Sequence, residues 1–321
     1  MNAKHLKNPI IAATIATAVA CAPRYHHAEP LAPSALWTPL PTEFVEVDGM
    51  QIATLDSGGE GAPIVLIHGL SSYTGYWEHQ VAHLAGSHRV LALDLPGYGG
   101  SSRPDAPYTP PWFADVVHAW MGELEVDSAI VVGHSLGGQV AMTLALEHPE
   151  AVDALVLAAP AGFETFSRGE SAMIKRFWDE ERALKTSEQA VRASMLGAVF
   201  NVHDDGVERL IEERVRLGKH PAFAGTSVAV SRSIAGMLDW PIRDRLGHIE
   251  APTLIVFGTA DRMIPNPLLH GGWTRAVAES GRDAIPGSQL ELIVGAGHTV
   301  QHDAPAEFNA AIDTFLARVA Q

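Results

Sequence analysis

The sequence predicts an α/β fold in which a mostly parallel sheet is covered by helices on both faces. Short apolar runs rich in valine, isoleucine and leucine alternate along the chain with longer segments of helical period. The apolar runs do not alternate with polar residues, as expected for strands that are buried on both faces. With 321 residues, the chain is long enough to bury a large core.

The composition narrows the class of partner. Hydrophobic residues make up 47% of the chain and charged residues 18%, which is ordinary for a globular protein. The formal net charge of −15 argues against nucleic acid or an anionic lipid surface as a partner. Because Cys21 is the only cysteine, an internal disulfide is excluded.

The first 42 residues predict an export signal followed by a spacer. Lys4 and Lys7 precede a short apolar run that ends directly before Cys21. This pattern resembles a bacterial lipoprotein signal over residues 1–21, which implies an exported protein held at a membrane only by a lipid on Cys21. Ordinary cleavage near residues 20–28, with a soluble exported product, stays open. Five prolines predict an extended linker over residues 22–42.

The first part of the core is predicted over residues 43–160. Alternating residues around Asp48-Gly49 predict a hairpin at the start of this part. Buried strands and helices of 3.6-residue period then alternate. The predicted strands are 43–48, 50–56, 64–68, 89–93, 129–132 and 154–159, and the helices are 73–85, 111–124 and 139–146.

A helical cap is predicted over residues 161–250, because this stretch holds no strand-like run. Its helical segments are 168–184, 188–200, 207–217, 226–238 and 242–246. The parallel pattern resumes in residues 251–321, with strands at 252–258 and 289–294 and helices at 268–279 and 306–319. The sheet therefore has eight strands, and the cap follows the sixth of them.

The stretch from Ala129 to Gln139 predicts a reactive serine at a sharp turn between a strand and a helix. Gly133 and Gly137 flank Ser135 at two residues on either side. Side chains at these two positions would collide with the neighbouring strand and helix, while the strained turn holds the serine hydroxyl clear of the sheet. The first turn of the helix offers the Leu136 N–H to an oxyanion.

Further motifs make the resemblance plain: from residue 43 to the C-terminus the chain resembles the α/β-hydrolase superfamily. The motifs are Leu66-Ile67-His68-Gly69-Leu70, Asp94-Leu95-Pro96-Gly97-Tyr98-Gly99-Gly100-Ser101, Gly258-Thr259-Ala260-Asp261-Arg262 and Gly295-Ala296-Gly297-His298. The superfamily's chain order of serine, acid and histidine implies Ser135, Asp261 and His298 as a catalytic triad. It also implies Leu70 and Leu136 as the backbone donors of an oxyanion hole. Asp283 and Asp303 stay open as alternative acids.

Two other groups of residues are candidates for binding roles. Apolar side chains of the cap either line an acyl pocket or form the cap's own core: Phe177, Trp178, Phe200, Phe223, Met173, Met195 and Met237. His79 and His83 have the helical spacing of zinc ligands, but no acidic or third ligand is expected to accompany them. An ordinary helix face, with no metal and no cofactor, is therefore expected.

The resemblance implies a serine hydrolase that cleaves carboxylic esters, a carboxylesterase or lipase-like enzyme with an apolar small-molecule substrate. Two enzymes using the same triad stay open: a carbon–carbon bond hydrolase of the kind acting on ring-cleavage dienones, and a perhydrolase. A ligand-binding protein with the hydrolase fold is the non-enzymatic alternative. Relatives that carry an aspartate nucleophile are excluded by Ser135. The sequence does not indicate an oligomeric state.

Overall fold

A computed structural model of the protein describes residues 24–185 and 187–319. The predicted signal segment and Cys21 lie outside these residues. Within them, no helix combines the length and the apolar character that crossing a bilayer requires.

The predicted sheet is confirmed as one eight-stranded sheet with the strand order β1-β2-β4-β3-β5-β6-β7-β8. The first two strands form the predicted hairpin and pair antiparallel, and β2 also runs antiparallel to β4. All other neighbouring strands are parallel. The strands are β1 Glu43–Val47, β2 Met50–Asp56, β3 Pro63–Ile67, β4 Arg89–Leu93, β5 Ala129–His134, β6 Val152–Ala158, β7 Thr253–Gly258 and β8 Gln289–Ile293.

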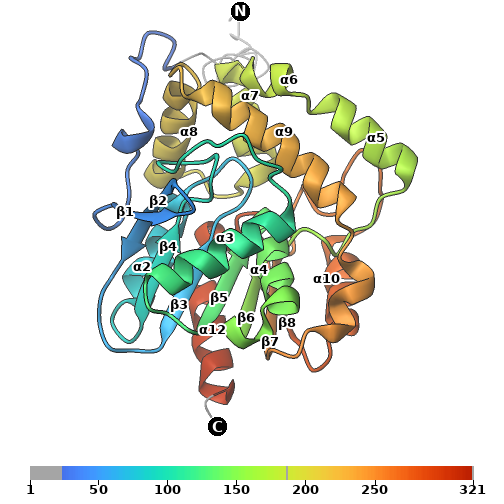
Figure 1. Ribbon diagram of the computed structural model, residues 1–321. Coiled ribbons are helices and arrows are strands. Elements are labelled where there is room, and N and C mark those ends of the chain that lie inside the picture. The colour runs from blue at the N-terminus through green and yellow to red at the C-terminus, as the bar shows by residue number, and fades with distance from the viewer. Residues whose placement is uncertain (1–23, 186, 320–321) are drawn as a thin grey trace, which may run out of the picture.

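Helices cover both faces of this sheet. On one face α3 (Pro110–Glu123), α4 (Leu136–Glu147) and α10 (Thr274–Ala284) pack against alternate strand residues such as Val65 and Ile67. The intervening residues, such as Ile64 and Leu66, face α2 (Glu78–Leu84) and α12 (Pro305–Val319) on the other side. Figure 1 shows α3 and α4 in front of the sheet and α12 behind it. Both side-chain rows of the central strands are buried, which explains their continuous apolar runs.

The cap lies between β6 and β7 in the chain and consists only of helices and turns in the described residues. Figure 1 shows its helices gathered at one end of the sheet. They are α5 Arg168–Phe177, α6 Glu180–Leu184, α7 Glu188–Ser194, a π-helical turn Met195–Val199, α8 Asp205–Leu217, α9 Phe223–Asp239 and a 3₁₀ turn Arg243–His248.

Several predicted helices differ from the structure; the one expected over 73–85 starts as a 3₁₀ turn and is α-helical only from Glu78. The helix expected over 168–184 breaks at Trp178, because the Asp179 carboxylate accepts the Arg182 N–H (2.8 Å) and so begins a second helix. The helix expected over 268–279 begins only at Thr274. Before it, the Asn266 side chain accepts the N–H groups of Leu268 and Leu269 in a turn.

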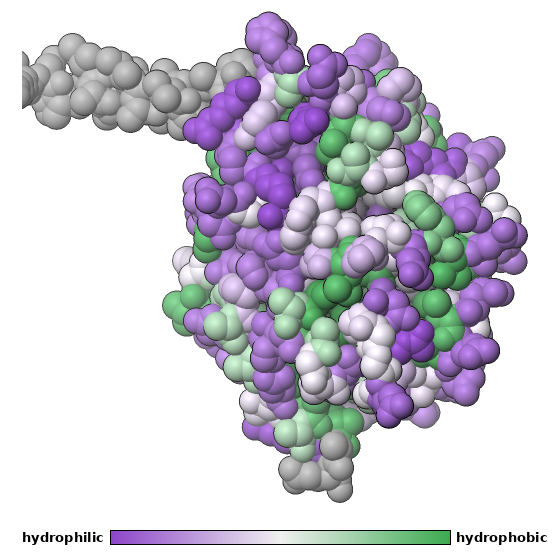
Figure 2. Space-filling view, turned by 90° about the vertical axis from the view of Figure 1, so that its left-hand side faces the viewer, coloured by the Kyte–Doolittle hydropathy of each residue, from purple (hydrophilic) through white to green (hydrophobic). Residues whose placement is uncertain are grey.

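The described part of the predicted linker, residues 24–42, lies along the cap instead of projecting as a free spacer (Figure 1). The hydroxyl of Tyr25 donates to Glu208, and the Trp37 N–H donates to Glu213 at 2.8 Å. The Leu31 N–H donates to the carbonyl of Arg216 at 3.1 Å. All three acceptors belong to α8. Figure 2 shows this face of the molecule, where hydrophilic residues dominate and hydrophobic ones lie in small groups.

Candidate active site

The turn between β5 and α4 places Ser135 in a backbone conformation that non-glycine residues rarely adopt, with φ 51° and ψ −115°. A Cβ atom on Gly133 would lie 2.3 Å from the carbonyl oxygen of Gly137. A Cβ on Gly137 would lie 2.3 Å from the carbonyl oxygen of Ile67 in β3. Both positions therefore require glycine, and the turn stores strain of about 1–3 kcal/mol at Ser135.

The structure brings Ser135, His298 and Asp261 into one hydrogen-bonded row. Nε2 of His298 lies 3.0 Å from Oγ of Ser135, and its Nδ1–H donates to Oδ2 of Asp261 at 2.9 Å. The other oxygen of Asp261, Oδ1, accepts the N–H groups of Met263 (2.7 Å) and Ile264 (3.0 Å). The carboxylate is thus fixed on both sides, and it holds the imidazole with the Nε2 lone pair turned to the serine hydroxyl.

The alternative acids do not contact the His298 ring. Asp303 accepts the N–H of Gly297 at 2.7 Å and that of Asn201 at 3.0 Å, so it fixes the loop that carries His298. Asp283 lies at the surface and pairs with Arg282. Asp261 is therefore the only one of the three predicted acids that reaches the imidazole.

A second buried histidine, His134, is hydrogen-bonded to the backbone of His298. Nε2–H of His134 donates to the backbone carbonyl of His298 at 3.1 Å. Burial, with the nearby His298 adding to it, lowers the pKa of His134 well below its usual value. His134 is therefore a neutral hydrogen-bond donor and does not compete for the serine proton.

The predicted oxyanion donors lie on adjacent segments of the same sheet end. Leu136 begins α4, so its N–H has no acceptor within the helix. Leu70 follows β3. Among the residues that the structure describes, no backbone carbonyl accepts the N–H of Leu70 or that of Leu136. The loop before Leu70 is held by the buried His68, which accepts the Leu95 N–H (2.9 Å) and donates to the carbonyl of Gly69 (2.8 Å). This fixed loop can hold a backbone donor in place before substrate arrives.

A cavity of about 760 Å³ lies between the cap and the Ser135–His298 pair. Most of its wall is apolar, and α9 contributes Val230, Ile234 and Met237. Ser135 and His298 thus border a largely apolar space of a size that holds a small-molecule ligand.

The predicted pocket residues divide into two groups. Phe177 and Trp178 line the cavity, together with Met195 and Met237. The prediction is wrong for Phe200 and Phe223, which are buried elsewhere. Phe200 packs against Tyr76 and His302, and Phe223 lies under the guanidinium of Arg214. Met173 is half-exposed at the surface. Helical spacing predicts that such residues are buried but not on which side.

The cavity residues that the sequence reasoning missed include Arg214 and Tyr76, which lie near Ser71 in the cavity wall. Within the described chain, the Arg214 guanidinium and the hydroxyls of Tyr76 and Ser71 have no hydrogen-bond or ion-pair partner. Burial lowers the pKa of Arg214 to about 10, so it stays charged at neutral pH. A signal existed in the sequence, because Arg214 interrupts the buried stripe of α8 between Leu210 and Leu217.

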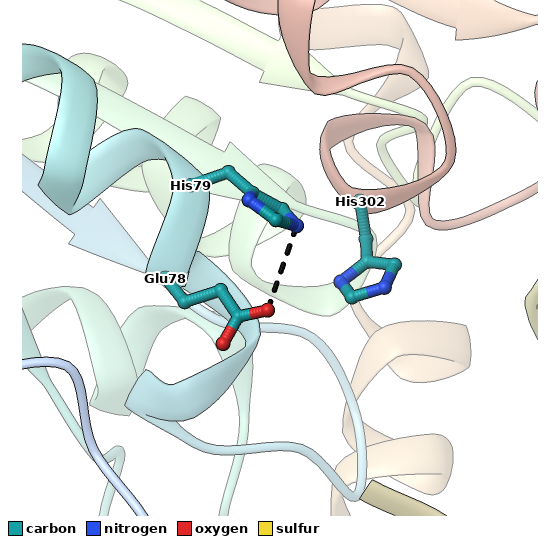
Figure 3. A group of neighbouring side chains, drawn as sticks. All are labelled: Glu78, His79 and His302. Carbon is teal, nitrogen blue, oxygen red and sulfur yellow. Dashed lines mark ion pairs between the residues drawn. The ribbon is translucent and has the colours of Figure 1, made fainter. Parts of the chain in front are cut away.

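The two histidines of α2, His79 and His83, do not converge on one point. His83 pairs with Asp313 of α12 at 2.9 Å. His79 turns instead to Glu78 and to His302, which comes from a distant part of the chain (Figure 3). The expectation that no third ligand accompanies His79 was therefore wrong.

A serine, a histidine and an aspartate aligned at the end of a mostly parallel sheet, with the serine on a strained strand-to-helix turn, define the nucleophile-elbow class of hydrolase folds. The chain belongs to the alpha/beta hydrolase fold family, whose model matches residues 62–305. The predicted superfamily is thereby confirmed.

Three comparisons illustrate the range of this family. The chain is 31% identical to the 2-hydroxymuconate semialdehyde hydrolase of Pseudomonas sp. strain CF600, over 82% of this chain and 89% of that protein. A probable hydrolytic enzyme from Pseudomonas aeruginosa shares the fold, with a TM-score of 0.81, 24% identity and coverage of 90% of this chain and 99% of the other. A bacterial membrane phospholipase A has a TM-score of 0.70 and 26% identity, over 98% of this chain and all of that one (100%).

Proposed function

We propose that this hydrolase-family protein cleaves carboxylic esters through an acyl-enzyme intermediate on Ser135. The observation that carries the proposal is the 3.0 Å contact between Ser135 and His298 beneath an apolar cavity. A serine hydroxyl is too weak a nucleophile to act alone at neutral pH, and an imidazole oriented by a carboxylate supplies the base that it needs.

In the proposed reaction, Oγ of Ser135 attacks the ester carbonyl carbon while its proton passes to Nε2 of His298. The N–H groups of Leu70 and Leu136 stabilise the oxyanion, and Asp261 stabilises the imidazolium. His298 then returns the proton to the departing alkoxide, which leaves as the alcohol. Water attacks the acyl-enzyme with His298 again as the base, so that the acid is released and Ser135 is restored.

Ester substrates are favoured by the character of the cavity and by one comparison. The wall formed by α9 and by Phe177 and Trp178 suits an acyl chain or ring. The similarity to a membrane phospholipase A, at 26% identity over nearly the whole chain, also supports an ester substrate.

A panel of p-nitrophenyl esters with acyl chains of two to twelve carbons tests the proposal. The Ser135→Ala variant should lose all but a residual activity, whereas Ser128→Ala, at the opposite end of β5 and bonded to Asp153, should match the parent protein. A fluorophosphonate probe should label the parent protein and Ser128→Ala but not Ser135→Ala. Full ester turnover by Ser135→Ala would refute the nucleophile assignment.

Carbon–carbon bond hydrolysis is the second candidate, and one observation favours it. Arg214, Tyr76 and Ser71 line the cavity, and the guanidinium of the first and the hydroxyls of the other two have no hydrogen-bond or ion-pair partner in the described residues. Such donors suit a substrate that carries a carboxylate. The 31% identity to a 2-hydroxymuconate semialdehyde hydrolase supports the same reading.

The two candidates are separated by substrate. Cleavage of a ring-cleavage dienone without turnover of any p-nitrophenyl ester would favour the carbon–carbon bond hydrolase. The Arg214→Gln variant measures the role of the cation. We expect about a 10- to 100-fold lower kcat/KM for a substrate with a carboxylate and no change for a neutral ester, since a charge-assisted hydrogen bond contributes about 1.5–3 kcal/mol. Equal losses on both substrates would contradict an anion-binding role.

We further propose that the protein is exported and lipid-anchored at Cys21, on the strength of the signal-like residues 1–21. The Cys21→Ser variant should then move from the membrane fraction to the soluble fraction of the producing bacterium and should no longer incorporate radiolabelled palmitate. Labelling that persists in Cys21→Ser would refute the anchor.

A further inference from the structure

Two histidines and a glutamate from distant parts of the chain converge between α2 and α11 (Val300–Asp303). Glu78 and His79 begin α2, and His302 lies on α11, four residues after the triad histidine. One donor atom from each of the three residues lies within 4.8 Å of the other two. Figure 3 shows the three side chains turned toward one another, with His79 Nε2 3.5 Å from Glu78 Oε1.

The ring of His302 has one satisfied nitrogen and one orphaned nitrogen. Nε2 lies 3.4 Å from Oδ1 of Asp204, the residue that precedes α8 of the cap. Nδ1 is buried and has no hydrogen-bond partner. In Figure 3 this nitrogen is on the side of the ring that faces His79 and Glu78. A carboxylate on one nitrogen and a free lone pair on the other is the arrangement that metal-ligating histidines show in proteins.

Glu78, like His302, has one side-chain atom engaged by a neighbour and one left for the cluster. Oε2 of Glu78 accepts a hydrogen bond from Arg209 at 2.5 Å, so that Oε1 is left for the histidine side. Gly206 keeps the adjacent space open. A Cβ atom at this position would lie 3.2 Å from Glu78 Oε1, from Asp204 Oδ1 and from Cε1 of His302 at once.

We propose that Glu78 Oε1, His79 Nε2 and His302 Nδ1 bind a divalent transition-metal ion of the zinc type, with water as the fourth ligand. Two imidazoles and one carboxylate suit zinc, cobalt or nickel better than calcium or magnesium, which prefer oxygen ligands. Around a tetrahedral zinc with bonds of about 2.0–2.1 Å, the donor atoms lie about 3.4 Å apart. The Glu78–His79 pair already has this spacing, and side-chain rotation draws in His302.

The site is separate from the triad and its role is to join parts of the fold. It ties α2 of the core to α11, which follows the His298 loop, and through Asp204 to the first turn of α8 in the cap. His79 is partly exposed, so that an ion reaches the site from solvent. Because the unfolded chain does not hold these ligands together, bound metal should raise the melting temperature of the protein.

A second histidine group provides the matched control. His118, His148 and Glu150 also lie close together, but the two rings stack in parallel at 4.1 Å and His148 pairs with Asp115. Parallel stacked rings do not direct their lone pairs at one point, so His148→Ala should leave metal binding intact. His83→Ala, on the same helix as His79, is the control for helix α2.

The test is zinc titration of the EDTA-treated, dialysed full chain in competition with a chromophoric chelator, together with thermal melting. We expect one zinc ion per chain in the parent protein, at least tenfold weaker binding in His79→Ala and in the isosteric Glu78→Gln, and unchanged binding in His83→Ala and His148→Ala. Zinc should raise the melting temperature only of the proteins that bind it, and circular dichroism checks that each variant is folded.

Three results would overturn the proposed metal site. Absence of a stoichiometric zinc ion in the parent protein would overturn the proposal. So would parent-like binding by Glu78→Gln and His79→Ala, and so would binding that is lost in His148→Ala and kept in His79→Ala. Cobalt provides an independent readout, because the bound ion in a four-coordinate site should give visible absorption in the parent protein and in His83→Ala but not in His79→Ala.

Discussion

The Asp261→Asn variant tests the triad most sharply, because the structure predicts how the new amide is oriented. In the parent protein Oδ2 accepts the Nδ1–H of His298, and Oδ1 accepts the N–H groups of Met263 and Ile264. The single oxygen of asparagine can keep only one of these two roles. If the NH₂ group faced Met263 and Ile264, two buried donors would lose their acceptor, at about 1–3 kcal/mol each.

This difference of about 2–6 kcal/mol favours the orientation in which the NH₂ group faces His298. The imidazole must then accept at Nδ1 and carry its proton on Nε2, where it can no longer take the proton of Ser135. A wrong tautomer of this kind lowers kcat by about 10⁴-fold, which corresponds to about 5.5 kcal/mol of transition-state stabilisation. KM should stay within a few-fold, because Asp261 does not line the cavity.

Steady-state kinetics on the best p-nitrophenyl ester, with a melting curve for each variant, provide the assay. Asp283→Asn is the control at the surface and should match the parent protein. Asp303→Asn should lower the melting temperature, because Asp303 fixes the loop before His298. The reasoning is refuted if Asp261→Asn keeps more than a tenth of the parent kcat, as an order-of-magnitude threshold, or if a folded Asp303→Asn loses as much as Asp261→Asn.

Three other substitutions have definite outcomes. Gly137→Ala should destabilise the protein by about 3 kcal/mol or more in urea unfolding, since its Cβ would lie 2.3 Å from a backbone oxygen of β3. A loss of less than about 1 kcal/mol would show that this position is not crowded. Leu70→Ala should keep kcat within about threefold because the backbone N–H remains, and a loss of about 100-fold would show that the side chain matters. A hydrogen bond to Glu164 raises the pKa of His270 above its ordinary 6.5, with desolvation opposing it. The protonated form is therefore favoured by folding, so its stabilisation is complete below about pH 6.5 and is lost as the pH rises through the raised pKa. The melting temperature of the parent protein should therefore fall as the pH rises through this pKa, and that of His270→Gln should not show this fall. Identical curves of melting temperature against pH for the two proteins would exclude the linkage.

The sheet and the elbow were predictable because their signals are local. The strands Ile64–Ile67 and Ala129–Val132 are apolar on both faces, and the spacing of Gly133, Ser135 and Gly137 fits one turn only. These features depend on neighbours within a few residues, so the sequence carries them directly.

The cavity wall and the histidine cluster were not predictable in the same way, because they depend on contacts across the chain. Helical period places Phe200 and Phe223 in a buried stripe, but the tertiary packing decides that Phe200 faces Tyr76 and His302. The sequence predicts an ordinary helix face at His79 and His83, whereas the ring of His79 contacts that of His302, from a distant part of the chain. Arg214 is recognisable in the sequence as a cation on the apolar stripe of α8, but the neighbouring residues do not indicate that it lines the cavity.

The attachment of the N-terminal segment to the cap limits the reach of any anchor that precedes it. The backbone N–H groups of Arg24 and Tyr25 both donate to Glu188 of α7. Three residues of extended chain span at most about 11 Å, so a lipid on Cys21 would act as a short tether. In the proposed lipid-anchored protein, the bilayer would therefore lie near α7 of the cap.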